Sequence, residues 1–426
     1  MKRSTLSVVI GLIQYGTFSI ETSLMAPFFP IKGYEKGLSK LVVGLVSAAF
    51  PLANMIGVPV LLTFVRPTDI YFMFFAGPIV SAISFMCFGI LEYGPDGTSF
   101  GIMAFTCMFT AGFGAAINFS SLYVVLTLAK KKWERQIGPL LEASYGTGVV
   151  IGPPLGSLLY GVGGYTLPFV TSGIFQLFIA ILAKLVIEEK TVRDDGTSPS
   201  IMFYLTYLSK PYIIYVMICI MLSSSMFGAI DTTLGPHLKE SFGLSEKVIG
   251  FAFLGFGITY ALAGVIFGIL VDKGQGGRVF VVCSFLLPLS LLLLYFSSVF
   301  TPLNLVSINV IALGLIGIYV AGAFVPGYIL LETFSLQYEM GDPNAAKMFA
   351  GFAICLSYGF GGLFGPIIIG GFAFESFGFS NAMLAEVFSL LFGCIFVLLM
   401  IMSKGLLRPF YHYEEENLPI KKNVLN

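Results

Sequence analysis

The sequence Ser144-Tyr145-Gly146-Thr147-Gly148, followed by Gly152-Pro153, occurs again as Ser357-Tyr358-Gly359-Phe360-Gly361, followed by Gly365-Pro366. Both parts of this motif are displaced by 213 residues, which is half of the 426-residue chain. A second pair supports the repeat, since Gly37-Leu38-Ser39 with Val42 and Gly44 returns as Gly243-Leu244-Ser245 with Val248 and Gly250. Two matches in the same order indicate an internal duplication. In an apolar chain, duplicated halves are typical of transporters, whose substrate path runs between the halves.

Composition identifies the environment of these halves. Hydrophobic residues make up 57% of the chain and charged residues 11%, and the mean hydropathy is +0.91. A helix needs about 20 mainly apolar residues to cross a bilayer, and only helices or closed barrels satisfy their backbone there. The apolar segments are long and continuous, which favours helices. We predict an all-α integral membrane protein with twelve transmembrane helices, at 5–29, 40–64, 70–91, 101–129, 138–161, 165–187, 211–235, 247–271, 278–299, 304–332, 347–374 and 380–404.

A polar interruption at 188–210 divides the chain near its middle. It predicts a linker between two pseudo-symmetric six-helix halves, 1–187 and 211–404, and residues 405–426 form a polar tail. With both termini cytoplasmic, 17 Lys and Arg fall on cytoplasmic segments and five on the opposite side. This asymmetry predicts that orientation by the positive-inside rule.

Charge and cysteine content exclude several kinds of partner. The net charge is zero and no basic surface stands out, which argues against nucleic acid. All six cysteines lie in apolar spans, without the spacing of a metal site or a disulfide framework. We therefore expect no metal and no cofactor. No span carries a catalytic constellation, so an enzyme is disfavoured, and two unlike halves disfavour a channel with a symmetric filter.

Several motifs carry a family resemblance. Gly148-x-x-x-Gly152-Pro153-x-x-Gly156 resembles the antiporter motif of the major facilitator superfamily, and Asp272 with Arg278 resembles its cytoplasmic gating motif. Further segments resemble the vesicular amine transporters, and within them the polyamine branch. They are Ala26-Pro27-Phe28-Phe29-Pro30, Lys36-Gly37-x-Ser39 with Gly44, Asn54, Glu142 ahead of Gly152-Pro153-Pro154, Phe227-Gly228-x-x-Asp231-x-Thr233-Leu234 and Phe253-Leu254-Gly255.

The resemblance implies the major facilitator fold, with two six-helix halves rocking about a central cavity. It also implies organic amines, polyamines foremost, exchanged for protons across an intracellular vesicle membrane rather than the plasma membrane. Gly148, Gly152, Pro153, Gly156, Asp272 and Arg278 would act in gating. One departure bears on coupling, because the place of a buried arginine tied to proton movement corresponds to Thr110 in the fourth span.

Buried acids are the strongest functional candidates, since a carboxylate inside the bilayer persists where it faces a polar cavity, a cation or a proton. Glu21 shares a helical face with Gln14 and Thr17, which indicates a cavity-lining stripe; the alternative is a solvated position near the luminal mouth. Asp231, late in the seventh span, is a candidate for cation binding and proton coupling; its alternative is a helix-end carboxylate. The two occupy equivalent spans, so they could face each other across the path.

Other candidates supplement these acids. Glu142, early in the fifth span, is a candidate proton carrier, and its alternative is an interfacial acid paired with Lys130–Lys132 or Arg135. Neutral hydrogen bonds or cation–π contacts to a substrate could come from Asn54, Asn118, Tyr260 and Tyr358. We expect Glu386, in the supporting twelfth span, to be structural.

The hypothesis from the sequence is a monomeric secondary active transporter of organic cations, whose partners are a small cationic substrate, protons and the lipid bilayer. Two alternatives stay open. The chain could be an uncoupled facilitator or sensor of the same fold, or a carrier of a neutral or lipid-like small molecule.

Overall fold

The computed structural model describes residues 3–64, 67–189, 201–299, 306–337 and 343–403, and every regular element there is helical. The N-terminal half contains α1 (Arg3–Leu24), α2 (Phe29–Glu35), α3 (Lys40–Phe64), α4 (Ile70–Ile90), α5 (Thr98–Ala129), α6 (Glu134–Gly163) and α7 (Thr166–Val186), with single 3-10 turns η1 (Pro67–Asp69), η2 (Leu91–Tyr93) and η3 (Lys131–Trp133). The C-terminal half contains α8 (Ile201–Leu208), α9 (Pro211–Phe242), α10 (Glu246–Ala252), α11 (Leu254–Asp272), α12 (Gly276–Val299), α13 (Val306–Gln337), α14 (Pro343–Phe364), the π-helical segment η5 (Gly365–Ala373) and α15 (Phe374–Ser403).

The helices agree closely with the predicted spans. Among the described residues, nine helical runs are long and apolar enough to cross a membrane, or ten if α1 and α2, bent by 44°, form one span. One of these runs, Ala345–Phe396, contains parts of α14 and α15 with η5 between them, and it has a kink within α15 at Gly378, whose φ is +77°. The predicted twelve are obtained by dividing this run at Gly378 and adding α6. The first and eighth spans are not straight, because a turn after Leu24 separates α1 from α2 and a break at Phe253 separates α10 from α11.

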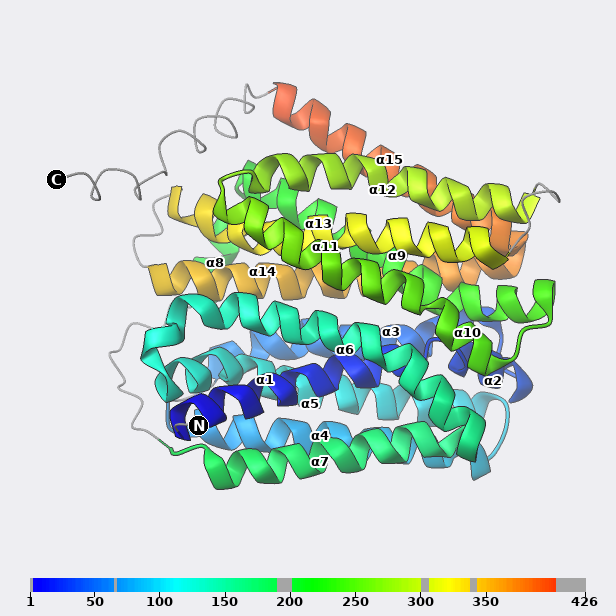
Figure 1. The fold of residues 1–426 in the computed structure, drawn as a ribbon, viewed down its shortest axis with the longest axis horizontal. Helices are drawn as coiled ribbons and strands as arrows, with labels where there is room; N and C mark the ends of the chain where they lie inside the picture. The colour runs from blue at the N-terminus through cyan, green and yellow to red at the C-terminus, as the bar shows by residue number, and fades with distance from the viewer. Residues whose placement is uncertain (1–2, 65–66, 190–200, 300–305, 338–342, 404–426) are drawn as a thin grey trace.

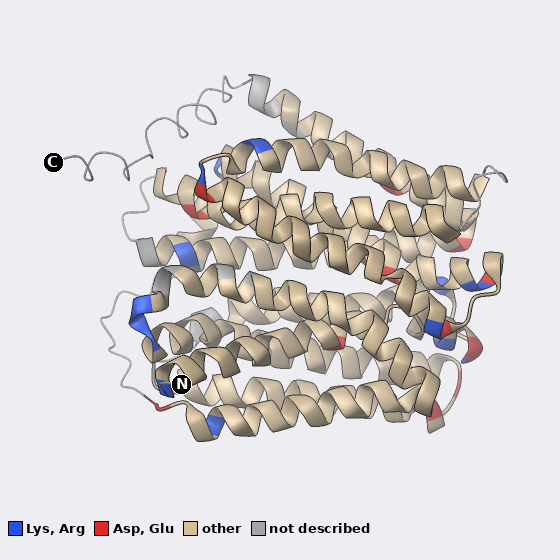
Figure 2. Cartoon of the chain, viewed as in Figure 1, with Lys and Arg blue, Asp and Glu red and all other residues tan. Residues whose placement is uncertain are grey.

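The helices run along the long axis of the molecule, and the two halves lie side by side (Figure 1). The starts of α1 and α14 lie at one end, which we call the near end; α2 and α10 lie at the other, the far end. Charged residues gather at these two ends and are sparse between them (Figure 2). This distribution is expected when the middle of each helix lies in hydrocarbon.

The halves meet along two seams. In one seam α3 packs against α14 and η5, and in the other α6 packs against α10 and α11. Glycine allows the backbones to approach closely at both: a Cβ at Gly44 would collide with the carbonyl oxygen of Pro366, and a Cβ at Gly257 would lie 2.8 Å from Cα of Val150.

Within each half, the duplicated motif packs one pair of helices. Gly148 allows α6 to pack closely against α1, because a Cβ at this position would collide with the Ser19 hydroxyl. Its counterpart Gly361 allows α14 to pack closely against α9, because a Cβ there would collide with the Ser224 hydroxyl. The repeat therefore encodes the same helix contact twice.

Candidate functional site

A cavity of about 230 Å³ lies between the halves and extends from the middle of the bundle toward the near end. Apolar and aromatic side chains form most of its wall, with hydroxyls and one amide among them. The lining residues come from α1, α3, α5 and α6 on one side and from α13 and α14 on the other: Tyr15, Phe18, Thr22, Phe50, Asn54, Val58, Phe119, Ser120, Leu122, Tyr123, Val124, Gly138, Leu141, Tyr145, Phe324, Tyr328, Lys347, Gly351, Phe352, Ile354, Cys355 and Tyr358. The basic residue of this wall, Lys347, lies on the first turns of α14 at the near end.

A smaller chamber of about 60 Å³ continues the cavity toward the far end. Thr22, Phe50 and Tyr358 line both spaces, so the two are adjacent. Asp231 of α9 lines the chamber, and no described side chain donates a hydrogen bond to its carboxylate or forms an ion pair with it. A carboxylate without a basic partner in an apolar surrounding attracts a cation or a proton.

Thr110, which corresponds to the missing arginine of the fourth span, lies on the outer face of α5. Thr110 is exposed and donates its hydroxyl to the Thr106 carbonyl, so it does not face the path. The α5 residue that lines the Asp231 chamber is Met108, two residues earlier. The resemblance assigned Thr110 from its place ahead of Gly114-Ala115-Ala116, and the structure turns that position toward the outside of α5. In either case α5 contributes no charge to the chamber wall.

Two tyrosines, Tyr145 and Tyr358, line the cavity, and Tyr358 also lines the chamber. The Tyr145 hydroxyl donates to the Tyr358 hydroxyl across the two halves, with 3.1 Å between the oxygens. These residues are counterparts in the duplicated motif. Equivalent residues near a pseudo-twofold axis approach each other, so the contact between the two tyrosines could have been predicted from the repeat. The sequence prediction included Tyr358 and missed Tyr145.

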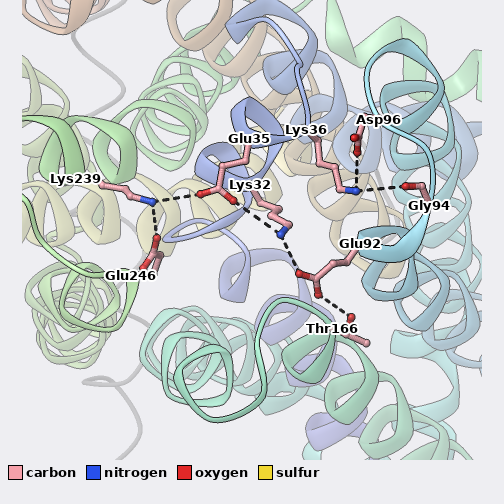
Figure 3. Close-up of polar contacts among 9 residues, drawn as sticks. All are labelled: Lys32, Glu35, Lys36, Glu92, Gly94, Asp96, Thr166, Lys239 and Glu246. Carbon is pink, nitrogen blue, oxygen red and sulfur yellow. Dashed lines mark hydrogen bonds and ion pairs between the residues drawn. The ribbon is translucent and has the colours of Figure 1, made fainter.

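Ion pairs close the far end (Figure 3). Lys239 of α9 pairs with Glu35 of α2 at 3.5 Å, across the two halves, and with Glu246 of α10 at 2.7 Å. Lys32 continues this chain, since its Nζ lies 3.9 Å from Glu35 and 2.9 Å from Glu92. Beside it, Lys40 Nζ lies 3.6 Å from the ring centroid of Phe374, and the Leu41 amide donates to Glu375 at 3.0 Å. The structure therefore represents a conformation in which the two halves are in contact at the far end and close it.

The six predicted substrate-binding residues separate into three groups. Asn54, Tyr358 and Asp231 line the cavity or the chamber. Glu21 and Asn118 are fully buried inside the N-terminal half, and neither is among the residues lining those two spaces. Tyr260 lies at the α6–α11 seam, where its ring faces Gly146. The structure therefore does not bring Glu21 and Asp231 together.

The remaining candidates concern coupling and gating. Glu142 is on α6, but its side chain lies outside the described part of the structure. Gly148, Gly152 and Gly156 face α1, at Ser19, Ser23 and the Leu24 backbone, and Pro153 lines a small pocket next to Asp231. Asp272 and Arg278 flank the turn between α11 and α12. Within the described ranges, no group of three or more His, Cys, Asp or Glu side chains could hold a metal ion.

The family model for the Major Facilitator Superfamily matches residues 11–331 and 216–422, which together cover most of the sequence. The chain belongs to the major facilitator superfamily. A solved structure with the same fold is a bacterial homologue of the human lysosomal transporter Spinster in an inward-facing, occupied conformation. It superposes with a TM-score of 0.71 over 94% of this chain and 97% of that one, at 13% sequence identity. The predicted twelve-helix fold is confirmed by this family and by the helices described above.

Curated relatives within the superfamily match part of the chain. The mouse MFS-type transporter SLC18B1 is 32% identical over 59% of this chain and 54% of its own length, and the human protein of the same name is 30% identical over the same shares. The human synaptic vesicular amine transporter is 29% identical over 30% of this chain and 24% of its own. The chain thus matches about half the length of its SLC18B1 relatives. The resemblance to the vesicular amine transporter group is confirmed at the level of sequence.

Proposed function

We propose that this protein is a secondary transporter that exchanges organic amines, polyamines foremost, for protons across the membrane of an intracellular vesicle. The observation that carries the proposal is the Asp231 carboxylate, which lines a chamber at the inner end of the cavity and has no described basic partner. The names of the relatives support the same class of cargo, since one of them is a vesicular amine transporter.

In this proposal an amine enters the cavity from the near end and reaches Asp231 after passing Tyr145 and Tyr358. The aromatic rings of the cavity attract the ammonium groups through cation–π contacts. The Asn54 amide, 7% exposed on the wall of the cavity, offers a hydrogen bond. Lys347 at the near end repels cations, so the attraction has to come from the deeper carboxylate.

Exchange follows if a proton and the amine compete for the same carboxylate. When the chamber opens to an acidic lumen, a proton neutralises Asp231 and releases the amine. When the path reopens toward the cytoplasm, the proton leaves and the anionic site is restored. Glu142 is the second proposed proton carrier.

Gating in this proposal uses both ends of the molecule. The near end is cytoplasmic, with both termini, and the ion pairs of the far end face the lumen. Gly148, Gly152, Pro153 and Gly156 let α6 slide against α1, and Asp272 and Arg278 close the near end when the far end opens. The transporter acts as a monomer, because each chain contains both halves of the path.

The test is uptake of labelled spermidine into proteoliposomes with an acidic interior. We expect uptake that requires the pH gradient and that is lost in Asp231→Asn and Glu142→Gln. Absence of uptake by correctly folded wild-type protein would contradict the polyamine assignment. Uptake that ignores the gradient would favour an uncoupled facilitator.

A second candidate is a carrier of a neutral or lipid-like molecule, which the largely apolar wall of the cavity favours. The two functions differ in their need for Asp231. A neutral cargo would be carried equally well by the Asp231→Asn variant, whereas an amine would not.

A further inference from the structure

Glu21 is a buried acid outside the path described above. Its side chain is 0% exposed and lies inside the N-terminal half, between α1 and α4. The Ser81 hydroxyl donates to Oε2 at 3.2 Å, and the other carboxylate oxygen, Oε1, is buried without any hydrogen-bond partner.

Other buried polar side chains of the N-terminal half also have hydrogen-bonding atoms without a partner. Gln14 and Asn118 both donate to the Phe74 carbonyl, at 3.0 and 2.9 Å, and each keeps a side-chain oxygen without a partner. In Gln176 of α7, which is 0% exposed, neither amide atom has a partner. Buried polar atoms in proteins are almost always satisfied, so partners such as water are expected among these groups.

Gln176 lies level with the Glu21–Ser81 contact. Gly173, three residues before it on α7, packs against the carbonyl of Ala82, the residue that follows Ser81 on α4. Because α7 runs antiparallel to α4, Gln176 falls within about one helical turn, roughly 5 Å, of Ser81 along the bundle axis. A water between them would have the Ser81 hydroxyl, the Gln176 amide and Glu21 Oε1 as partners.

The C-terminal half contains a buried acid that differs in this respect. Glu386 of α15 is also 0% exposed, but Ser225 donates to its Oε1 at 2.8 Å and Ser389 to its Oε2 at 3.0 Å. Both of its oxygens have a protein donor, as expected for a structural carboxylate. Glu21 has one such donor, which leaves Oε1 for a species that binds and leaves.

Helix α1 links Glu21 to the path. One face of α1 carries Phe18 and Thr22 into the cavity, whereas Glu21 lies on the face directed into the N-terminal half. Serines on a third face contact the glycines of α6. A change in charge at Glu21 therefore acts on the helix whose other faces form the cavity and the α6 contact.

The described groups around this site include no basic side chain close to Glu21. From α4 comes Ser81 and from α7 Gln176, whereas Tyr145 of α6 lines the cavity, where its hydroxyl is bonded to Tyr358. Lys184 lies near the end of α7, 4.7 Å from the Phe75 ring and paired with Glu189. From α5 comes the neutral Asn118.

We propose that Glu21, with Ser81 and Gln176, forms a hydrated proton-binding site inside the N-terminal half, separate from the amine path at Asp231. The proposal rests on the proton exchange suggested above and adds, to the proton that competes with the amine at Asp231, a second proton-binding site that the amine does not enter. Protonation removes the charge inside the half and favours one position of α1, and amine binding at Asp231 responds through that helix.

Two assays with labelled spermidine test this in proteoliposomes: accumulation driven by a pH gradient, and amine–amine exchange without a gradient. In Glu21→Gln we expect at least a tenfold loss of accumulation, with exchange within twofold of wild type. The matched control Glu386→Gln changes neither. Accumulation that persists in Glu21→Gln would overturn the proposal, and so would loss of both activities in a monodisperse variant, because Glu21 would then act on the cargo.

Further measurements test the Glu21 site if the Glu21→Gln variant does not fold. Gln176→Leu is expected to shift the pH of half-maximal accumulation while exchange is unchanged, and an unmoved pH profile would overturn the hydrated site. Accumulation driven by a sodium gradient at constant pH would replace the proton by sodium and overturn the assignment. If wild-type protein moves no amine at all, the proposed function fails; a pH-dependent carboxyl infrared band that is absent in the Glu21 variant and present in Glu386→Gln would still support the proton site.

Discussion

In the C-terminal half Asp231 faces the space between the halves, whereas in the N-terminal half the buried acid, Glu21, is directed into its own bundle. One helix contact is nevertheless shared by the two halves, since Gly148 packs against α1 as Gly361 packs against α9. The duplication has thus kept this helix contact and has not kept the positions of the ionisable groups. A rocking mechanism requires the shared contact, while binding and coupling can be divided between unlike halves.

The largest effect is expected from removing the charge on the path. Asp231→Asn should weaken spermidine binding to the purified protein at least about thirtyfold, equivalent to about 2 kcal/mol, because a buried cation loses its counter-charge. Equilibrium binding of the labelled amine measures this. Glu386→Gln is the control and should bind normally. If Glu21→Gln weakened binding as much as Asp231→Asn, both buried acids would act on the amine, which would contradict the different roles of the two halves.

The next effect tests the shared packing. Gly148→Ala and Gly361→Ala should each destabilise the protein by about 1–3 kcal/mol, because the added methyl collides with a serine hydroxyl on the neighbouring helix. The unfolding midpoint in detergent reports the loss. Gly268→Ala is a suitable control, since a Cβ there meets no atom within 4 Å. A loss at only one of the two motif positions would show that the repeat does not encode equivalent contacts.

The sequence predicted the spans well because the length of an apolar run is a local property. It did not predict which way a polar stripe faces. Gln14 and Glu21 share a helical face, and we interpreted that face as lining the cavity. An inner helix such as α1 has neighbours on every side, so a polar face can be directed toward the path or into the half, and the sequence of α1 alone does not distinguish these.

Contacts between the halves were partly predictable. The repeat indicated a pseudo-twofold relation, and the structure brings its two tyrosines together. Asp231 was found from its rarity as an acid in a span, and its chamber could not be predicted, because Thr22, Phe50 and Tyr358 come from three different helices. Pairing of helices distant in sequence is a tertiary property that neither composition nor periodicity specifies.

A smaller effect is expected from the tyrosine pair that joins the halves. Tyr145→Phe and Tyr358→Phe each remove the same hydrogen bond, worth about 0.5–1.5 kcal/mol. The double variant should therefore be little worse than either single one in unfolding midpoint. Only Tyr358 also lines the Asp231 chamber, so amine affinity should change in Tyr358→Phe and not in Tyr145→Phe. Additive losses would mean that the two hydroxyls act independently.

The smallest effect is expected at the far end, where the Glu35–Lys239 ion pair crosses between the halves. The two side chains are 51% and 39% exposed, and such pairs contribute about 0–1 kcal/mol. Glu35→Gln should ease opening of this end and speed amine exchange by at most about fivefold. Salt should diminish the difference from wild type, because it screens exposed charges. Asp96→Asn is the matched control, since Asp96 pairs with Lys36 inside one half, and it should leave exchange unchanged. An equal acceleration in both variants would assign the effect to local loop stability rather than to the contact between halves, and the far end would then be held closed by packing alone.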